Sequence, residues 1–306
     1  MMTKTLAAAA FAASLVACVP PDETSTELRS AIPTSEQVQI KLPGGAVRQV
    51  GQLAQWYVAT RDVTRTLNGG TAWVLTLVHS IVQFPATSVD GDKHTWGPWS
   101  DALAPAEYKL DVRDVGDGTY EYQLSGRSKT QAGAQFEVIV DGKADPRKGD
   151  LQGSGQLLLD FEAGRRVNPI DAGDARGEVT VKYDLAAKHL DLDIVSIDDK
   201  GQPVTADYAY NETADGGGDM LFDIAGNAGG TTKNETITLR SRWQATGAGR
   251  ADARIAGGDL TVGVTASECW DTAFKRVFYA DSLGFSPAEG LAESCAFRTQ
   301  DLPPVK

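Results

Sequence analysis

The feature that most constrains the fold is a two-residue alternation of apolar and polar side chains in the middle of the chain. Tyr108, Leu110 and Val112 alternate with charged residues, and Tyr120, Tyr122 and Leu124 repeat the pattern after an Asp-Val-Gly-Asp-Gly turn. Successive side chains of a strand point to opposite faces, so these runs predict strands with one buried and one wet face. The two runs together predict an antiparallel hairpin.

The register of this hairpin follows from the turn. Folding about Gly116 places Val112 opposite Tyr120, Leu110 opposite Tyr122 and, one step further, Tyr108 opposite Leu124. All apolar residues then share one face, as a half-buried pair requires.

A second pair of alternating runs, 178–185 and 190–194, behaves alike. Folding about the intervening Ala-Ala places Tyr183 opposite Leu190. The same register brings Lys182 opposite Asp191 on the wet face, where opposite charges attract.

Further short apolar runs extend the β pattern through the rest of the chain. The predicted strands are 136–140, 157–161, 204–210, 220–224, 237–243 and 260–264, separated by clusters of Gly, Asn and Asp. About ten strands with short connections and no helical pattern between them indicate an antiparallel meander rather than βαβ units.

The N-terminal part differs, because two helices are predicted within 47–84. Apolar residues recur at three- and four-residue spacing over 47–67 and end at Asn-Gly-Gly. Residues 71–84 are apolar nearly all round, which fits a buried helix or a buried strand, and their length favours a helix.

These elements define the expected fold class. It is mainly β: an antiparallel meander forming a curled sheet or half-barrel, with the two N-terminal helices packed on its apolar face. Such a sheet resembles the half-barrel of periplasmic lipoprotein carriers, which hold an acyl chain in the concavity. Fold alone does not define an activity.

The first 17 residues resemble a secretory leader. A single Lys4 precedes an apolar run of about a dozen residues, which is too short to span a bilayer. The leader ends in Leu15-Val16-Ala17-Cys18, which resembles the lipobox of bacterial lipoproteins. We therefore expect a signal peptide over 1–17, a lipidated tether over 18–35 and a single domain over 36–306.

The lipobox resemblance implies a covalent lipid on Cys18 and an acylated amine, so that the protein is held at the membrane. Val19 follows Cys18 where an Asp would imply inner-membrane retention, which favours the outer membrane, at its periplasmic face or at the cell surface. The alternative is a plain secreted protein with a coincidental cysteine. Two or more acyl chains anchor stably, whereas one binds only marginally.

Three cysteines leave an even pair if Cys18 carries lipid. In an oxidising compartment we expect Cys269 and Cys295 to form a disulfide, which stabilises the fold by roughly 3–4 kcal/mol in the chain-entropy model. Two buried free thiols are the alternative.

The formal net charge of −12 argues against nucleic-acid partners, whose phosphates require clustered Lys and Arg. It also argues against attraction to anionic lipid headgroups.

No motif in the sequence fixes a catalytic activity. Trp96 and Trp99 bracket Gly-Pro and predict a turn whose rings either stack on a ligand such as a sugar or pack onto the sheet edge. The histidines have no partner spacing that indicates a metal pair or a triad, and the acidic clusters fit ordinary turns better than Ca²⁺ loops. We expect no cofactor and no metal site.

The leading hypothesis is therefore a non-enzymatic cell-envelope lipoprotein that binds a hydrophobic small molecule in a half-barrel, or simply supports the envelope. The alternatives are a surface-displayed adhesion module that contacts glycans through Trp96 and Trp99, and a hydrolase with a spatially assembled acidic pair.

Overall fold

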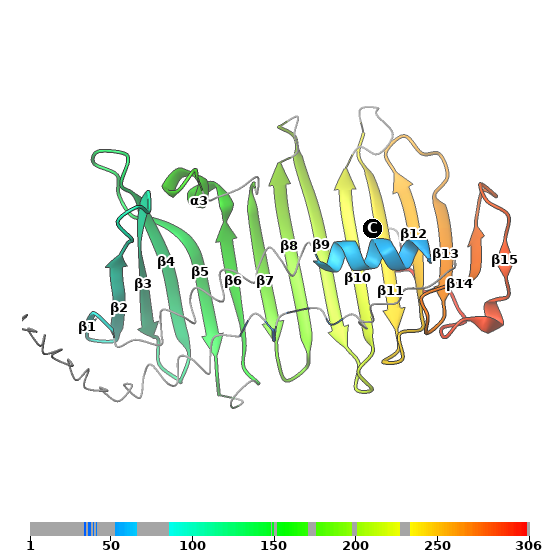
Figure 1. Ribbon diagram of the computed structural model, residues 1–306, viewed down its shortest axis with the longest axis horizontal. Coiled ribbons are helices and arrows are strands. Elements are labelled where there is room, and N and C mark those ends of the chain that lie inside the picture. Colours follow the sequence, from blue (N-terminus) through cyan, green and yellow to red (C-terminus); the bar gives the residue numbers. More distant parts are fainter. Residues whose placement is uncertain are drawn as a thin grey trace, which may run out of the picture.

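The chain forms one open antiparallel sheet of 15 strands, in which every strand pairs with its neighbours in sequence (Figure 1). The computed structural model describes residues 34, 36–37, 39, 41, 53–65, 86–147, 149, 152–170, 176–197, 201–226 and 233–304. The predicted mainly β antiparallel meander is confirmed. Residues 1–33, which include the leader and Cys18, lie outside the described residues, as does 66–85 with the second predicted helix.

The strands follow one another with few interruptions. Their bounds are β1 Ser88–Asp90, β2 Lys93–Trp99, β3 Ala106–Asp114, β4 Tyr120–Ser128, β5 Glu137–Asp145, β6 Ser154–Asp160, β7 Glu178–Asp184, β8 His189–Ile197, β9 Pro203–Glu212, β10 Gly218–Gly226, β11 Glu235–Trp243, β12 Gly249–Gly257, β13 Val264–Trp270, β14 Arg276–Asp281 and β15 Glu289–Gly290. A short helix, α3 (Phe161–Val167), connects β6 to β7, and a 3-10 turn at Ala292–Ser294 follows β15.

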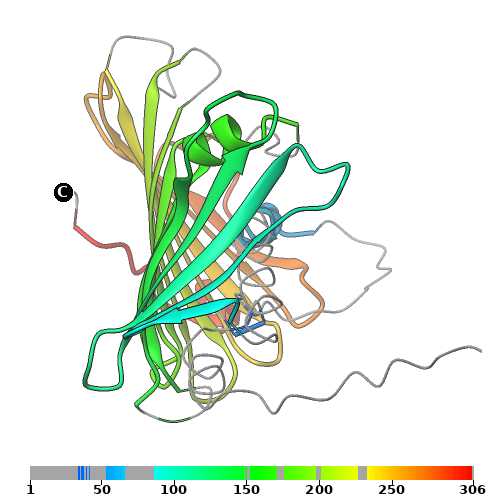
Figure 2. The same ribbon diagram turned by 90° about the vertical axis from the view of Figure 1, so that its left-hand side faces the viewer.

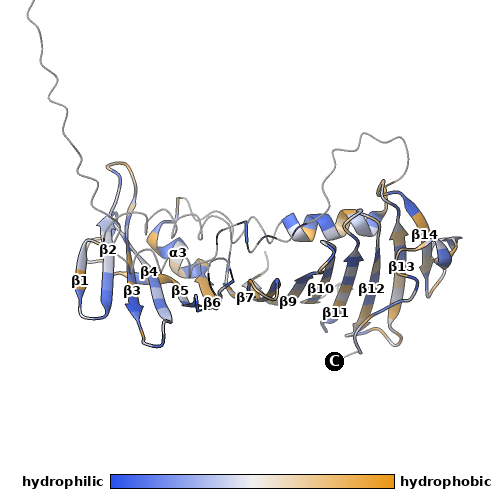
Figure 3. Ribbon diagram, turned by 90° about the horizontal axis from the view of Figure 1, so that it is seen from below, coloured by the Kyte–Doolittle hydropathy of each residue, from blue (hydrophilic) through white to orange (hydrophobic). Residues whose placement is uncertain are grey.

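The sheet is curved. Seen from below, both of its ends bend toward the same side, and residues 55–65, which are helical, lie on that side together with α3 (Figure 3). We call this the inner face and the opposite one the outer face.

The second predicted hairpin has the expected register. Tyr183 pairs with Leu190, and Lys182 pairs with Asp191. The Lys182 ammonium nevertheless binds the diagonal neighbour Asp193, at 3.1 Å.

The first predicted hairpin is wrong in register by two residues. Val112 pairs with Tyr122 rather than Tyr120, and Leu110 pairs with Leu124. The turn spans 115–119 and is centred on Asp117, whose φ is 55°. A two-residue slip preserves which residues share a face, so the apolar face is as predicted.

Five of the remaining predicted strands overlap β5, β6, β9, β10 and β11 to within one residue at each end of the prediction. The prediction of 260–264 is wrong, because the chain turns over 258–263 and β13 begins only at Val264. The sequence analysis missed β12, because most of its inner-face side chains are small, such as Ala251 and Ala253, and give no strong apolar signal. It also missed α3, whose first turn is capped by the Asp160 carboxylate accepting from the Ala163 N–H at 2.8 Å.

Most of the core lies on the inner face. One row of register partners crosses the sheet from β3 to β12: Val112, Tyr122, Gly142, Leu157, Val181, Leu192, Tyr208, Phe222, Leu239 and Ala253. Nearly all of these residues are buried. Burial of each large side chain contributes on the order of 1.5–3 kcal/mol, so this face supplies most of the driving force for folding.

The 55–65 helix packs on the inner face of β10–β13. Its Thr60 hydroxyl lies 2.5 Å from the Ser241 hydroxyl, and Tyr57 stacks on Phe274 with ring centroids 4.4 Å apart. The buried carboxylate of Glu268 accepts from the Trp56 N–H at 2.5 Å, so a strand residue caps the first turn of the helix. One helix of the predicted pair is thus described, and the packing of two helices stays a prediction.

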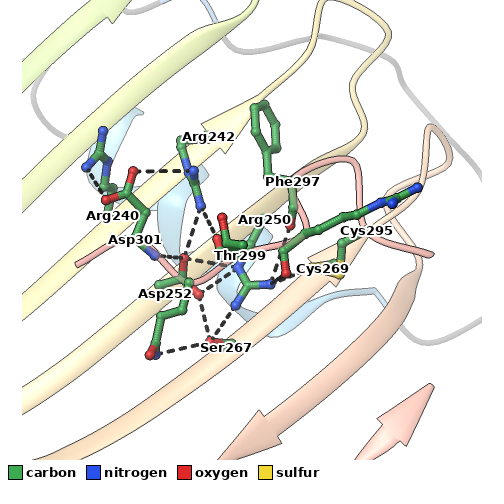
Figure 4. Close-up of polar contacts among 12 residues, drawn as sticks. Arg240, Arg242, Arg250, Asp252, Ser267, Cys269, Cys295, Phe297, Thr299 and Asp301 are labelled. Carbon is green, nitrogen blue, oxygen red and sulfur yellow. Dashed lines mark hydrogen bonds and ion pairs between the residues drawn. A yellow bond between two sulfur atoms is a disulfide. The ribbon is translucent and has the colours of Figure 1, made fainter. Parts of the chain in front are cut away.

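On the outer face, residues 296–304 run across β11–β13 as a C-terminal strap (red in Figure 2), on the opposite side of the sheet from the 55–65 helix. The predicted disulfide between Cys269 and Cys295 is present and fixes the start of the strap. Arg250 and Arg242 donate to the carbonyls of strap residues, and Asp301 binds Arg240 at 3.0 Å (Figure 4).

At the centre of these contacts lies a buried ion pair. Asp252 binds Arg250 at 2.8 Å and accepts from the Ser267 hydroxyl at 2.6 Å. The outer face over β11–β13 is therefore closed by charge and hydrogen bonds rather than by apolar packing.

Candidate ligand site

An aromatic row crosses the inner face at the end of the sheet that carries the β7–β8, β9–β10 and β11–β12 turns. It consists of Tyr183, Tyr210, Trp243 and Trp270. Tyr210 and Trp243 stack nearly parallel, with centroids 6.0 Å apart.

Three rings of the aromatic row lie over glycines of the neighbouring strand. Tyr183 covers Gly155, Trp243 covers Gly218 and Trp270 covers Gly249, and a Cβ at any of these glycines would collide with the ring. The glycines let the rings lie flat, which keeps this end of the inner face smooth and apolar.

A cavity of 230 Å³ opens at this end of the sheet, over β7, β8 and β9. Tyr183, Leu190 and Tyr210, neighbours in one register row, form its floor. Its rim is polar and includes Lys41 and Glu212. An apolar floor below a charged rim suits an amphipathic molecule.

The rim carries a three-membered ion cluster. Glu212 binds Lys188 and, at 3.1 Å, Lys41. The hydrogen bond from Lys188 holds the pKa of the Glu212 carboxyl below its usual range. The two ammonium groups share one carboxylate, which leaves this cluster with a net positive charge.

His189 extends the rim along β8. Its two ring nitrogens lie 2.7 Å from Asn211 Oδ1 and from Asp191 Oδ2. Acceptance by both oxygens requires a donor at each ring nitrogen, which is the charged form of the imidazole. Partial burial acts to lower the pKa of His189, but the hydrogen bonds to Asp191 and Asn211 outweigh it and place the pKa above its usual value.

Tyrosine hydroxyls on the inner face are buried in apolar surroundings. Burial raises the pKa of Tyr210 to about 12 and that of Tyr208 well above its usual range. Among the described residues, the hydroxyls of Tyr122 and Tyr208 have no hydrogen-bond partner. A buried unpaired hydroxyl costs about 1–3 kcal/mol, which a bound polar group or water would recover.

The predicted site residues fall elsewhere. Trp96 lies in β2 rather than in a turn, it is buried in the core, and the half-buried Trp99 packs against that core. This geometry agrees with the alternative of packing onto the sheet, and ligand contact by the two rings stays a prediction. Cys18 lies outside the described residues, so its lipidation also stays a prediction.

Two of the acidic residues predicted to lie in turns accept hydrogen bonds from neighbouring turn residues. The Asp114 carboxylate accepts from the Gly116 N–H, and that of Asp215 accepts from the Thr213 hydroxyl. Within the part of the chain that the structure describes, no group of three or more His, Cys, Asp or Glu side chains is arranged to hold a metal ion.

The sequence analysis missed the cavity rim. Lys41, Lys188 and Glu212 come from three separate segments, so no local pattern brings them together. Only the Tyr183–Leu190 pairing, predicted from alternation, indicated part of the floor.

Comparisons with known proteins add no relative: no family model matches the chain, and neither the curated proteins nor the solved structures gave a match. None of the helices among the described residues has both the length and the apolar character needed to cross a bilayer.

Proposed function

We propose that this protein is a non-enzymatic lipoprotein of the cell envelope, anchored at the outer membrane through Cys18, that binds a small apolar or amphipathic molecule on the inner face of its sheet. The observation that supports ligand binding most directly is the cavity floored by Tyr183, Leu190 and Tyr210 and rimmed by Lys41 and Glu212.

The size of the cavity limits the ligand. At 230 Å³ it lies just below the range of about 300–1,000 Å³ usual for small-molecule pockets, so it accepts a short chain or one end of a longer one. The apolar part of the ligand lies against Tyr183 and Leu190. An anionic end then meets the ammonium groups of Lys41 and Lys188.

The open, curved sheet supports the half-barrel part of the proposal. Its inner face is apolar over most strands, and the floor of the cavity belongs to this face.

Isothermal titration calorimetry with sodium octanoate tests the site in the full chain. We expect saturable binding to the natural protein and at least tenfold weaker binding to Leu190→Trp, because the indole fills the cavity. Leu221→Trp is the matched control, since Leu221 lies on the outer face of β10, and it is expected to bind as the natural protein does.

A variant of the cavity rim provides a second test in case Leu190→Trp lowers the thermal stability of the protein. Lys188→Ala, an exposed substitution, is expected to weaken octanoate several-fold and to leave 1-octanol unaffected. Absence of saturable binding for both probes, or equal binding by both tryptophan variants, would contradict the proposal.

The anchor has its own test. Cys18→Ala is expected to shift the protein from the membrane fraction to the soluble fraction and to abolish incorporation of labelled palmitate. Continued labelling of the alanine variant would show that lipid is attached elsewhere or not through this residue.

A further inference from the structure

The two ends of the sheet differ in what their loops expose. Loops that join an even-numbered strand to the next odd-numbered one meet at the upper end in Figure 1. Among the described residues, these loops expose six large apolar side chains: Leu103, Ile170, Leu260, Val262, Leu283 and Phe285. At the opposite end the described residues expose fewer: Val115 in the β3–β4 turn, Leu291 after β15, and Leu53, which pairs with Lys275 of the β13–β14 turn. We call the upper end the apolar edge.

Four of the six side chains lie on two neighbouring loops, 258–263 and 282–288. Phe285 is 79% exposed and Val262 69%. The loops start side by side, because the Ser282 N–H donates to the Thr265 carbonyl at 2.9 Å and the Ser282 hydroxyl accepts from the Thr265 N–H at 3.0 Å.

The second loop satisfies its own backbone. The Asp281 carboxylate accepts from the N–H groups of Leu283, Phe285 and Ser286 at 2.9–3.1 Å. A loop with paired N–H groups enters a medium of low polarity at far lower cost than one that must give up bonds to water. The Asp281 carboxylate thus holds the backbone of the loop that carries Leu283 and Phe285.

We propose that the apolar edge contacts the surface of a lipid bilayer, with Phe285, Leu283 and Val262 inserted at its interface. Exposed apolar side chains that gather together mark contact surfaces, and four of the six on the apolar edge gather on two neighbouring loops. They extend from the β2–β3 loop to the β14–β15 loop, roughly 55 Å along the sheet at about 4.8 Å per strand.

That spread favours a bilayer over one protein partner, since a partner of ordinary size covers only about 800 Å² on each side. The charge of the two loops indicates which lipids the bilayer needs. Asp259 is their single charged residue, and the chain as a whole carries −12. Contact therefore depends on apolar insertion, needs no anionic lipid and resists salt.

A local fluorescent reporter tests this inference separately from both the anchor and the ligand site. In a Cys18→Ala full chain the remaining cysteines form the disulfide, so an added cysteine is the single free thiol. Ser286→Cys, labelled with a nitrobenzoxadiazole dye, reports at the apolar edge. Val115→Cys, labelled in the same way, reports at the opposite end.

With vesicles of pure phosphatidylcholine we expect emission at position 286 to rise at least twofold, unchanged by 0.5 M NaCl, and emission at position 115 to stay constant. Adding Leu283→Ser and Phe285→Ser to the labelled 286 chain is expected to abolish the rise, with thermal melting confirming that it folds. No rise at 286, a rise equal at both positions, or a rise only with anionic lipid overturns the inference.

Discussion

The two faces of the same strands, β11–β13, are closed in opposite ways. On the inner face the 55–65 helix packs through Tyr57 and Thr60, with one buried carboxylate, Glu268, at its start. On the outer face the C-terminal strap is held by a row of arginines and by Asp301, with a disulfide at its beginning. Because successive side chains of a strand point to opposite faces, the same strands pack against the helix on one face and bind the strap on the other.

The difference teaches where a single change should matter most. Polar contacts between the 55–65 helix and the inner face are few, and their side chains are buried, so each lost partner leaves a buried group unsatisfied. At the rim of the outer network the charged side chains are partly exposed to water and share several partners, so each ion pair contributes little to the free energy of unfolding. The following substitutions probe that contrast, from the largest expected effect to the smallest.

Glu268→Gln should have the largest effect. Glu268 is fully buried and binds both the Trp56 N–H and Arg276, which is itself largely buried. Removing its charge leaves the guanidinium poorly compensated, and breaking a buried pair costs about 3–5 kcal/mol. Urea unfolding measures this loss. Glu289→Gln is the matched control, because Glu289 is the exposed second partner of Arg276 at 3.5 Å, and equal losses for the two would contradict the contrast.

Thr60→Val should cost about 1–3 kcal/mol, because it leaves the Ser241 hydroxyl buried without its partner. Ser241→Ala should behave alike. The double variant should be more stable than the sum of the two losses predicts, since both polar groups are then absent. Additive losses in this double-mutant cycle would mean that the two hydroxyls do not interact in solution.

Asp301→Ala tests the rim of the outer network. Asp301 is 45% exposed and binds Arg240 and Arg242, so we expect a loss of less than about 1 kcal/mol that shrinks further in 0.5 M NaCl. Thermal melting at two salt concentrations provides the measurement. A loss as large as that of Glu268→Gln would place the strap among the main determinants of stability.

The smallest effect concerns pH and His189. Its pKa in the folded chain lies above the ordinary 6.5, so its contribution to stability is complete below pH 6.5 and is lost as the pH rises through the folded value. The difference in unfolding free energy between the natural protein and His189→Gln should therefore shrink from pH 5.5 to pH 8.5. A difference that grows with pH would show that the imidazole is neutral in its setting. An NMR titration of the ring would give the midpoint directly.

Elements of the fold could be predicted where the residues that determine them lie close together in the sequence. Strands with a large inward residue at every second position, such as β3, β4, β7 and β8, were found with the correct faces. The Tyr183–Leu190 register was correct because its turn is short. The 115–119 turn was misjudged because a non-glycine residue, Asp117, adopts a positive φ there.

The candidate site could not be predicted from the sequence, because its residues meet only in the folded chain. The role of Gly155 and Gly218 beneath Tyr183 and Trp243 exists only after the strands pair. The same holds for Lys41 and Glu212, which meet across 171 residues of sequence. Strand β12 was missed because Ala251 and Ala253 are small, and the Glu268 cap was missed because its partner lies on the distant helix.

The central claim, a ligand site on the inner face at β7–β9, is tested most directly by native mass spectrometry of the full chain after exposure to octanoate. The account predicts a one-to-one adduct with the natural protein and with Leu221→Trp, and none with Leu190→Trp. The bare chain mass for the natural protein, or an adduct that persists in Leu190→Trp, would contradict it.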